Sequence, residues 1–276
     1  LLILLFVPLV SFGQIESVYY TSGASKYESK DYYGAIADYT KAIELNPNNP
    51  KTSVAYLKTG VAKYGLKDLD GAMADYNKAI EFDPDYFQAY AYRAIAKGTL
   101  SDFNGAISDL TKAIELKPND EISYGNRGLA KYYLEDYEGA ITDYTKAIEL
   151  NPGNYSDYLK RGQSKSNLMS NSDYTGAISD FTKAIELEPN DLVAYFNRAT
   201  PRCHLTVRDF YGAIDDCTKV IELDPGNFSA YSWRGIAKSR LKDYYGAIAD
   251  YTKMIELRPN MEISYGERGS SKLCFG

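Results

Sequence analysis

The sequence predicts an all-α solenoid built from antiparallel helix pairs. The stretch from Asp136 to Pro152 recurs seven times along the chain, each copy having a Gly-Ala pair whose glycine stands 13 residues before a proline. Successive copies begin 34 to 37 residues apart. A self-similarity of this period indicates a repeat array, in which each unit buries its apolar face against its neighbours.

The repeated stretch predicts an amphipathic helix. Its apolar residues recur every three or four positions and therefore share one face of a helix: Ala140, Ile141, Tyr144, Ala147 and Ile148. Pro152 ends that helix, because proline has no N–H to donate. A second helical pattern covers residues 121–133, just upstream. Each repeat is therefore expected to hold a first helix, called helix A, and a second, called helix B.

The helix pairs divide residues 14–276 into seven full repeats and a partial eighth. The expected boundaries are about 16–49, 50–86, 87–120, 121–154, 155–191, 192–227, 228–261 and, for the partial repeat, 262–276. The extra residues of the longer repeats fall around 50–53, 168–172 and 206–207, outside helix B.

Acidic and amide residues stand where helices are expected to begin. An aspartate precedes every helix B: Asp31, Asp68, Asp102, Asp136, Asp173, Asp209 and Asp243. Asn or Asp follows six of the prolines, before helix A: Asn49, Asp85, Asp120, Asn154, Asp191 and Asn227. Such side chains accept hydrogen bonds from the free N–H groups of a first turn, so we expect both sets to be N-caps.

The N-terminal segment predicts a signal peptide over residues 1–13. Residues 1–10 are apolar without a charge, and Ser11 and Gly13 are small residues placed for cleavage before Gln14. The segment is too short to span a bilayer. A buried N-terminal strand or helix is the alternative. Because a basic leader and an initiator Met are missing, we expect residues to precede Leu1. The mature chain is expected to be periplasmic or secreted, without a transmembrane segment.

The array resembles tetratricopeptide repeats. In the fourth repeat, residues at the family's spacing are Tyr124, Gly128, Ala140, Tyr144 and Pro152. The first of these places holds tyrosine in all eight helices A: Tyr19, Tyr56, Tyr90, Tyr124, Tyr158, Tyr195, Tyr231 and Tyr265. The resemblance implies a right-handed superhelix whose helices A line a concave face that binds proteins or peptides.

Charged residues depart from the family pattern in a regular way. Helix A carries Arg or Lys at two places four residues apart, which lie on one face, and helix B carries one Asp. We predict a ladder of ion pairs in which each Arg binds the Asp of the preceding repeat: Arg93–Asp75, Arg127–Asp109, Arg161–Asp143, Arg198–Asp180, Arg234–Asp216 and Arg268–Asp250. If each Arg instead paired within its own repeat, Arg268 would have no Asp as a partner. The alternative is a row of basic residues that grips an acidic ligand.

A partner groove is predicted on helices A of the first four repeats. Apolar and tyrosine residues there are expected to point away from helix B: Tyr20, Tyr27, Leu57, Val61, Tyr64, Ile95, Leu129, Tyr132 and Tyr133. The matching places in later repeats are polar. Such residues suit the binding of an extended or helical segment. Packing between repeats is the alternative for part of this set.

The sequence offers no catalytic constellation. His204 is the single histidine, and no phosphate-binding glycine loop is present. We therefore expect no enzyme, no cofactor and no metal. A net charge of −6 argues against nucleic acid as a partner. Cys203 and Cys217 form a disulfide or stay as buried thiols; both alternatives remain open.

The sequence thus predicts an exported, non-enzymatic scaffold that holds a protein or peptide partner in its concave groove. Two alternatives remain. The chain is a structural or assembly segment of a larger cell-envelope protein, or it is a fragment of a protein whose catalytic domain lies downstream. The sequence leaves the oligomeric state open.

Overall fold

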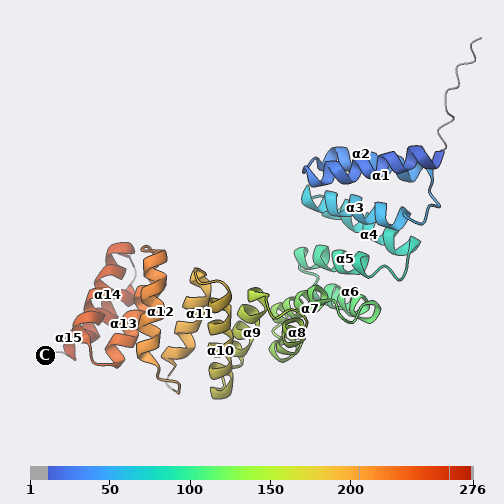
Figure 1. The fold of residues 1–276 in the computed structure, drawn as a ribbon. Coiled ribbons are helices and arrows are strands. Elements are labelled where there is room, and N and C mark those ends of the chain that lie inside the picture. Colours follow the sequence, from blue (N-terminus) through green and yellow to red (C-terminus); the bar gives the residue numbers. More distant parts are fainter. Residues whose placement is uncertain (1–11, 205, 261, 275–276) are drawn as a thin grey trace, which may run out of the picture. The chain divides into compact units, whose positions relative to one another are not determined.

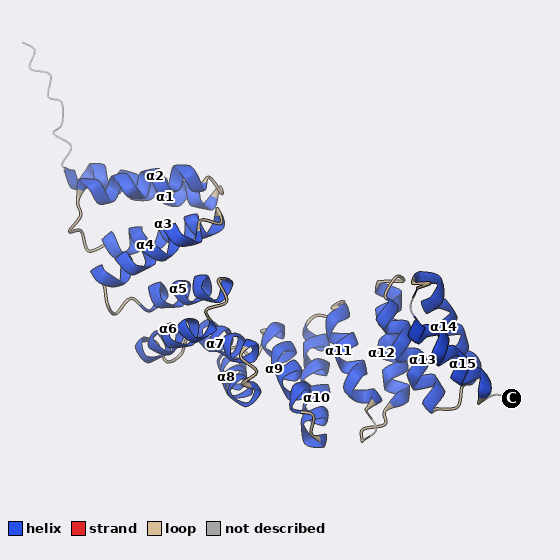
Figure 2. Cartoon of the chain, turned by 180° about the vertical axis from the view of Figure 1, so that it is seen from behind, coloured by secondary structure: helices blue, strands red, loops and turns tan. Residues whose placement is uncertain are grey.

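The computed structural model describes residues 12–204, 206–260 and 262–274, and every regular element in these ranges is an α-helix (Figures 1 and 2). The helices are α1 Phe12–Glu28, α2 Tyr32–Leu45, α3 Thr52–Gly65, α4 Leu69–Phe82, α5 Phe87–Thr99, α6 Phe103–Leu116, α7 Glu121–Tyr133, α8 Tyr137–Leu150, α9 Tyr155–Leu168, α10 Asn171–Leu187, α11 Leu192–Cys203, α12 Phe210–Leu223, α13 Phe228–Arg240, α14 Tyr244–Leu257 and α15 Glu262–Leu273. Odd-numbered helices are helices A and even-numbered ones helices B. The predicted all-α fold, with seven helix pairs and one further helix A, is confirmed. Residues 1–11 of the expected signal peptide lie outside the described residues.

The chain forms two compact units, Leu1–Leu134 and Glu135–Gly276. The first holds α1 to α7 and the second α8 to α15. Within each unit, every helix packs against the helices that precede and follow it, as Figure 1 shows. A helix B that lies in the same unit as both neighbouring helices A is therefore enclosed between helix A of its own repeat and helix A of the next. No described helix combines the length and apolar character needed to cross a membrane.

Small residues hold the two helices of a repeat close together. The alanines at the start of helix B are buried in every repeat, as are all five alanines one turn before its end. At the family's glycine place on helix A, Gly60 faces the Tyr76 ring so closely that an added Cβ would lie 2.6 Å from it. Gly162 faces Phe181 and Gly235 faces Tyr251 in the same manner, with Cβ distances of 2.7 Å. A buried aromatic ring of helix B thus fills the space that glycine leaves on helix A.

Aspartate caps begin six of the seven helices B, as predicted. The side chains of Asp31, Asp68, Asp102, Asp136, Asp209 and Asp243 each accept a hydrogen bond from the N–H of the glycine three residues on. Asp173 is the exception, and its predicted capping role is wrong. The extra residues before it extend α10 by nearly one turn, so Ser170 is the cap and accepts from the Asp173 N–H.

The caps of helices A follow the prediction in four of six cases. Asp120, Asn154, Asp191 and Asn227 cap α7, α9, α11 and α13. The prediction is wrong for Asn49 and Asp85. The side chain of Asn49 accepts from the Lys51 N–H in the turn before α3, and α5 begins after Tyr86 without a side-chain cap.

One backbone conformation recurs in every turn from helix A to helix B. The residue involved has a left-handed φ of 54° to 67° and is never glycine: Lys30, Lys67, Ser101, Glu135, Met169, Arg208 and Lys242. In the second repeat this conformation lets the Asp68 N–H donate to the Lys63 carbonyl, which closes the end of α3. The next residue, the capping aspartate, then begins helix B.

Candidate functional site

The residues of the predicted groove divide into two groups in the structure. Leu57 belongs to the core, at 3% exposure, packed with Ala72 and Tyr76. Its assignment to an open groove is wrong, because the side chain is buried in a cluster with residues of α4 and α5. Tyr20 and Tyr27 pack against the core of the first repeat, and Val61 and Tyr64 against that of the second; all four stay partly exposed.

Three of the other groove residues meet at one cavity, and the fourth lies beside it. Ile95 of α5 and Leu129 and Tyr133 of α7 line a cavity of about 240 Å³. Tyr132 contacts Tyr133 edge to face, with ring centroids 5.9 Å apart. Tyr133 is 56% exposed, so the cavity opens toward solvent beside an accessible aromatic ring. We call this space the α5–α7 cavity.

The sequence-based prediction missed several residues of the α5–α7 cavity. Its full lining comes from α5, α6 and α7: Ala94, Ile95, Gly98, Thr99, Phe103, Ala106, Leu110, Asn126, Leu129, Ala130 and Tyr133. No residue of this lining carries a charge. The signal that could have found the cavity is the pair Gly98 and Leu110, because both stand at places where several other repeats have tyrosine.

The rim of the cavity is ordered by aromatic and polar contacts. The Phe103 ring stacks on Tyr133 at a centroid distance of 5.0 Å. The hydroxyl groups of Tyr64 and Thr99 share a hydrogen bond of 2.9 Å, and Thr99 also donates to the Ile95 carbonyl. At this edge, side chains therefore link α3 to α5 and α6 to α7.

The ion-pair ladder exists, but its predicted pairing is wrong. Four of the six Arg bind the Asp of their own repeat, with Nη2 to Oδ1 distances of 2.6 to 2.7 Å: Arg93–Asp109, Arg161–Asp180, Arg198–Asp216 and Arg234–Asp250. The basic residue four positions later reaches the same carboxylate at 2.8 Å: Lys97, Lys165, Arg202 and Lys238. In the first two repeats, Lys26 and Lys63 bind Asp38 and Asp75.

Helix geometry explains the correction. Successive residues are turned by about 100° around a helix axis, so residues two apart point to nearly opposite sides. Asp180 of α10 faces α9 in its own repeat, while Thr182 faces α11 in the next. Arg198 of α11 accordingly donates from Nη1 to the Thr182 hydroxyl at 2.9 Å instead of pairing with Asp180.

The contact to the preceding repeat recurs along the ladder. The acceptor is the residue two positions after the Asp of the preceding helix B: Asn77 for Arg93, Thr111 for Arg127, Thr145 for Arg161, Thr182 for Arg198 and Thr218 for Arg234. The link between repeats is therefore a hydrogen bond, and the ion pair lies within the repeat.

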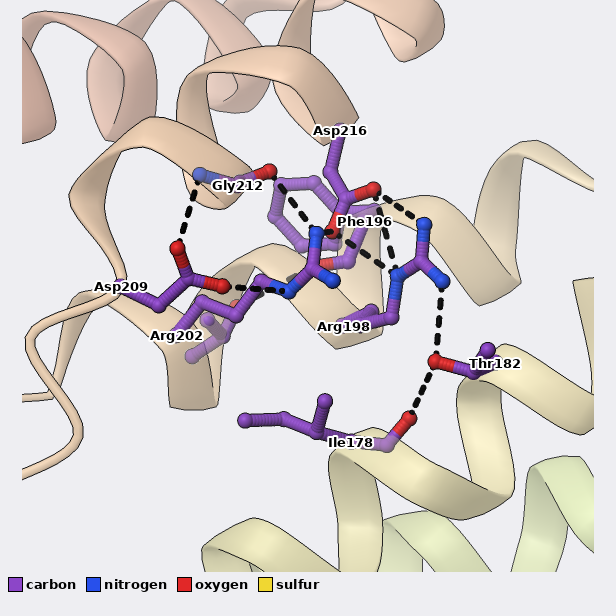
Figure 3. A network of polar contacts seen from close by, with 9 residues as sticks. Ile178, Thr182, Phe196, Arg198, Arg202, Asp209, Gly212 and Asp216 are labelled. Carbon is purple, nitrogen blue, oxygen red and sulfur yellow. Dashed lines mark hydrogen bonds and ion pairs between the residues drawn. The ribbon is translucent and has the colours of Figure 1, made fainter.

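The sixth repeat shows the complete arrangement (Figure 3). Asp216 is 2% exposed; Arg198 donates to both of its carboxylate oxygens, and Arg202 donates to Oδ2. Arg202 also donates to the Gly212 carbonyl and pairs with the capping Asp209. Burial raises the pKa of the Asp216 carboxyl, and the two guanidinium groups act in the opposite direction.

The Arg at the first of the two basic places of helix A also lies over the ring of the tyrosine three residues before it. The guanidinium carbon is 5.5 to 5.7 Å from the ring centroid for Arg93, Arg127, Arg161, Arg198, Arg234 and Arg268. In the repeats where Arg pairs with Asp, the Arg side chain thus has an aromatic ring as a partner in addition to the carboxylate and the hydroxyl or amide group. These contacts within the chain argue against the alternative that the row of basic residues grips an acidic ligand.

The described residues hold little that suggests other chemistry. Cys203 and Cys217 are free and buried, and burial raises the pKa of the Cys203 thiol to about 11. His204 bonds to the Thr206 hydroxyl and packs against Tyr174. Among the described residues, no group of three His, Cys, Asp or Glu side chains is placed to hold a metal ion.

Comparison with known families gives one consistent result. Models of the tetratricopeptide repeat match residues 20–87, 122–154 and 228–261. A comparison with curated proteins found no match.

Solved structures of repeat proteins are similar to this chain. The C-terminal part of a TPR repeat-containing protein from Cytophaga hutchinsonii is 20% identical, with a TM-score of 0.72 over 90% of this chain and 98% of that one. YrrB, described as a TPR protein with an unusual peptide-binding site, is 21% identical, with a TM-score of 0.64 over 70% and 97%. MamA is 26% identical, with a TM-score of 0.56 over 64% and 94%. These structures show the same fold, and the three matching repeat models together with the repeated helix pairs identify the chain as a tetratricopeptide-repeat protein.

Proposed function

We propose that this protein is a non-enzymatic interaction scaffold, which binds a peptide segment of a partner protein along helices A of its first four repeats. The observation that carries the proposal is the α5–α7 cavity, which is apolar and opens beside exposed Tyr133. A concave apolar site with a few polar groups is the usual form of a ligand site. Further support comes from YrrB, a protein of the same fold that is described as having a peptide-binding site.

The chemistry of the groove residues fits a peptide. Tyrosine offers a large contact area together with a hydroxyl group, and it loses little conformational freedom on binding. Tyr64 lies on α3 and Tyr132 and Tyr133 lie on α7, the helices A before and after α5, and all three remain partly or largely exposed. They can therefore contact a segment that runs from one repeat to the next.

The test uses a library of random 12-residue peptides, selected on the immobilised full chain. We expect selected peptides to bind the chain in solution, measured by fluorescence anisotropy. Replacing Tyr64, Tyr132 and Tyr133 together by Ala is expected to weaken binding at least about 10-fold, because truncation of interface tyrosines commonly costs more than 1 kcal/mol each.

The matched control replaces three exposed tyrosines that all lie at the second position of a helix B, Tyr33, Tyr211 and Tyr245. Binding by this second triple variant should equal that of the unaltered chain. A library that yields no ligand, or ligands that the groove variant still binds fully, would contradict the proposal. Self-association without peptide binding would favour the alternative of an assembly segment.

We also propose that the protein is exported to the periplasm or beyond the cell. The support is the charge-free apolar run of residues 1–10 followed by small residues before Gln14. Sequencing the N-terminus of the protein recovered from bacterial cells should give Gln14 as the first residue. A chain that keeps Leu1 to Gly13 would contradict export by this signal.

A further inference from the structure

The third repeat differs from its neighbours at one place on helix A. Tyrosine stands there in the first, second and fourth repeats, as Tyr27, Tyr64 and Tyr132, whereas the third has Gly98. The same repeat differs on helix B, where Leu110 replaces the tyrosine seen as Tyr39, Tyr76 and Tyr144. Two large side chains are therefore reduced within one repeat.

Where the tyrosine of helix A is present, it fills the space between neighbouring repeats. The Tyr27 ring packs against Tyr32 of its own helix B and lies 5.8 Å from the Lys58 ammonium group on the next helix A. The Tyr64 ring packs on the core of the second repeat, and its hydroxyl group reaches Thr99 on the next helix A. A tyrosine at this place thus spans from one helix A to the following one.

At Gly98 this space stays open. A Cβ atom added to Gly98 would meet nothing within 4 Å, and the α5–α7 cavity lies at this point with a volume of about 240 Å³. Ala94, Ala106 and Leu110 form its buried floor, with exposures of 1 to 2%. Because Leu110 is smaller than the tyrosine of the neighbouring repeats, it leaves more room at this floor.

The charges around the cavity limit what can enter. Its lining has no Asp, Glu, Lys or Arg, and the two cations of α5, Arg93 and Lys97, are both bound to Asp109. A charged group placed in the cavity would lose its hydration without finding a counter-charge, which is costly. An uncharged apolar group matches the lining. The Asn126 side chain in the lining can donate to and accept from a peptide backbone.

We propose that the α5–α7 cavity is an anchor pocket for one bulky apolar side chain, of the size of Leu, Met or Phe, from the bound peptide. This inference rests on the proposed function and adds the chemical identity of the residue that fixes the peptide. The anchor takes the place that tyrosine holds in the neighbouring repeats. Poorly bonded water that fills such an apolar space is displaced with a gain in affinity.

The experiment fills the pocket from within. Gly98→Tyr introduces the residue of the neighbouring repeats. It is expected to weaken the binding of a selected peptide about 10- to 100-fold, which corresponds to the free energy of burying one large apolar side chain. Gly98→Ala adds only one methyl group, which leaves most of the cavity open, and should change the affinity less than about 3-fold. Ser239→Tyr makes the equivalent change at the same place of α13 and should leave affinity unchanged.

Changes in the peptide test the same pocket from the other side. Replacing each peptide residue by Ala should reveal one apolar position whose loss costs about 10-fold or more, and Asp there should abolish binding. In the Gly98→Tyr chain, replacing this peptide residue by Ala should cost no more affinity than replacing its neighbours. Urea unfolding of each variant confirms that the fold is intact; if Gly98→Tyr does not fold, Gly98→Met serves in its place.

A small apolar probe tests the cavity without any peptide. With Ile and Leu methyl groups labelled with ¹³C, n-butylbenzene should shift the signals of Ile95, Leu110 and Leu129 in the full chain and not in the Gly98→Tyr variant. Absence of these shifts in the unaltered chain would overturn the inference. So would a peptide that depends on Tyr64, Tyr132 and Tyr133 and yet binds the Gly98→Tyr chain fully, while the proposed function would stand. A library that yields no ligand would contradict both the proposed function and the anchor pocket.

Discussion

The residue at the family's glycine place on helix A matches the size of its neighbour on helix B. Gly23, Gly60, Gly162 and Gly235 each lie against the aromatic ring of Tyr39, Tyr76, Phe181 or Tyr251. In the third repeat the ring is replaced by Leu110, and Ala94 stands opposite within one core cluster. In the sixth repeat the corresponding residues are Ala199 and Cys217, both fully buried. The volume removed on one helix is thus partly restored on the other.

This matching predicts the effect of Gly60→Ala. The new Cβ would lie 2.6 Å from the Tyr76 ring, so the free energy of unfolding should fall by about 1 to 3 kcal/mol, as for other overpacked cores. In a Tyr76→Leu background, which imitates the third repeat, the same change should cost clearly less. Urea unfolding of the four proteins measures this coupling. An equal penalty in both backgrounds would show that the ring is not the cause.

Buried tyrosines predict a loss of stability in alkaline solution. Burial raises the pKa of Tyr76 and of Tyr251 above the ordinary value of about 10. Above pH 10 the unfolded chain releases these protons while the folded chain retains them. The resulting stability is therefore complete below pH 10 and declines as the pH rises beyond it. Urea unfolding between pH 8 and pH 11 should show the decline, with a shallower slope for Tyr76→Phe. An unchanged slope in that variant would contradict the assignment.

At the scale of the element, helix B serves two neighbours with two different residues. Its Asp holds Arg and Lys of helix A in the same repeat, and the Thr two positions later accepts from Arg of the next repeat. The Thr hydroxyl donates in turn to the carbonyl one turn earlier, at 2.7 Å from Thr145 to Ile141. The hydroxyl proton of Thr145 is thus used in the bond to Ile141, and the hydroxyl oxygen can accept a hydrogen bond from Arg161.

The two contacts should differ in strength. Asp180→Ala leaves Arg161 and Lys165 without their carboxylate in a largely buried place, so the free energy of unfolding should fall by about 3 kcal/mol. Thr182→Val removes only the hydroxyl that Arg198 reaches, and should cost about 1 kcal/mol. Chemical denaturation of the two single variants gives both numbers. A threonine penalty as large as that of the aspartate would contradict this order.

The sequence predicted the elements better than it predicted their contacts. Helix positions and most caps follow from local patterns, since an apolar period and an Asp before Gly-Ala are properties of neighbouring residues. The partner of Arg161 does not follow from such patterns, because Asp143 and Asp180 stand at the same place of closely similar stretches and only the packing of helix B decides between them. The change of cap from Asp173 to Ser170 depended on whether the inserted residues would continue the helix.

The candidate site was predicted in part for the same reason. Ile95, Leu129 and Tyr133 were recognised by their spacing along helices A, and they do line a cavity. Leu57 has the same spacing but is buried, because the apolar face of a helix can meet its partner helix as well as solvent. Gly98 was overlooked, since a missing side chain leaves no pattern to follow.

At the scale of the whole molecule, the two compact units have separate cores. The clusters around Tyr39, Tyr76 and Leu110 all belong to the unit that ends at Leu134. We therefore expect residues 12–134 expressed alone to be helical by circular dichroism and to unfold cooperatively in urea. Residues 135–276 should behave in the same way. A fragment that stays unfolded would show that its repeats need the other unit.

Packing in this chain joins helices that are one or two elements apart, and this has a consequence for its synthesis. A helix pair has its main partners as soon as the following helix A has left the ribosome, so no repeat must wait for a distant segment. Contacts that are local in sequence also close quickly, because short loops cost little entropy. The chain can thus acquire its structure from the N-terminus onward while it is still being made, and little apolar surface is left uncovered at any stage.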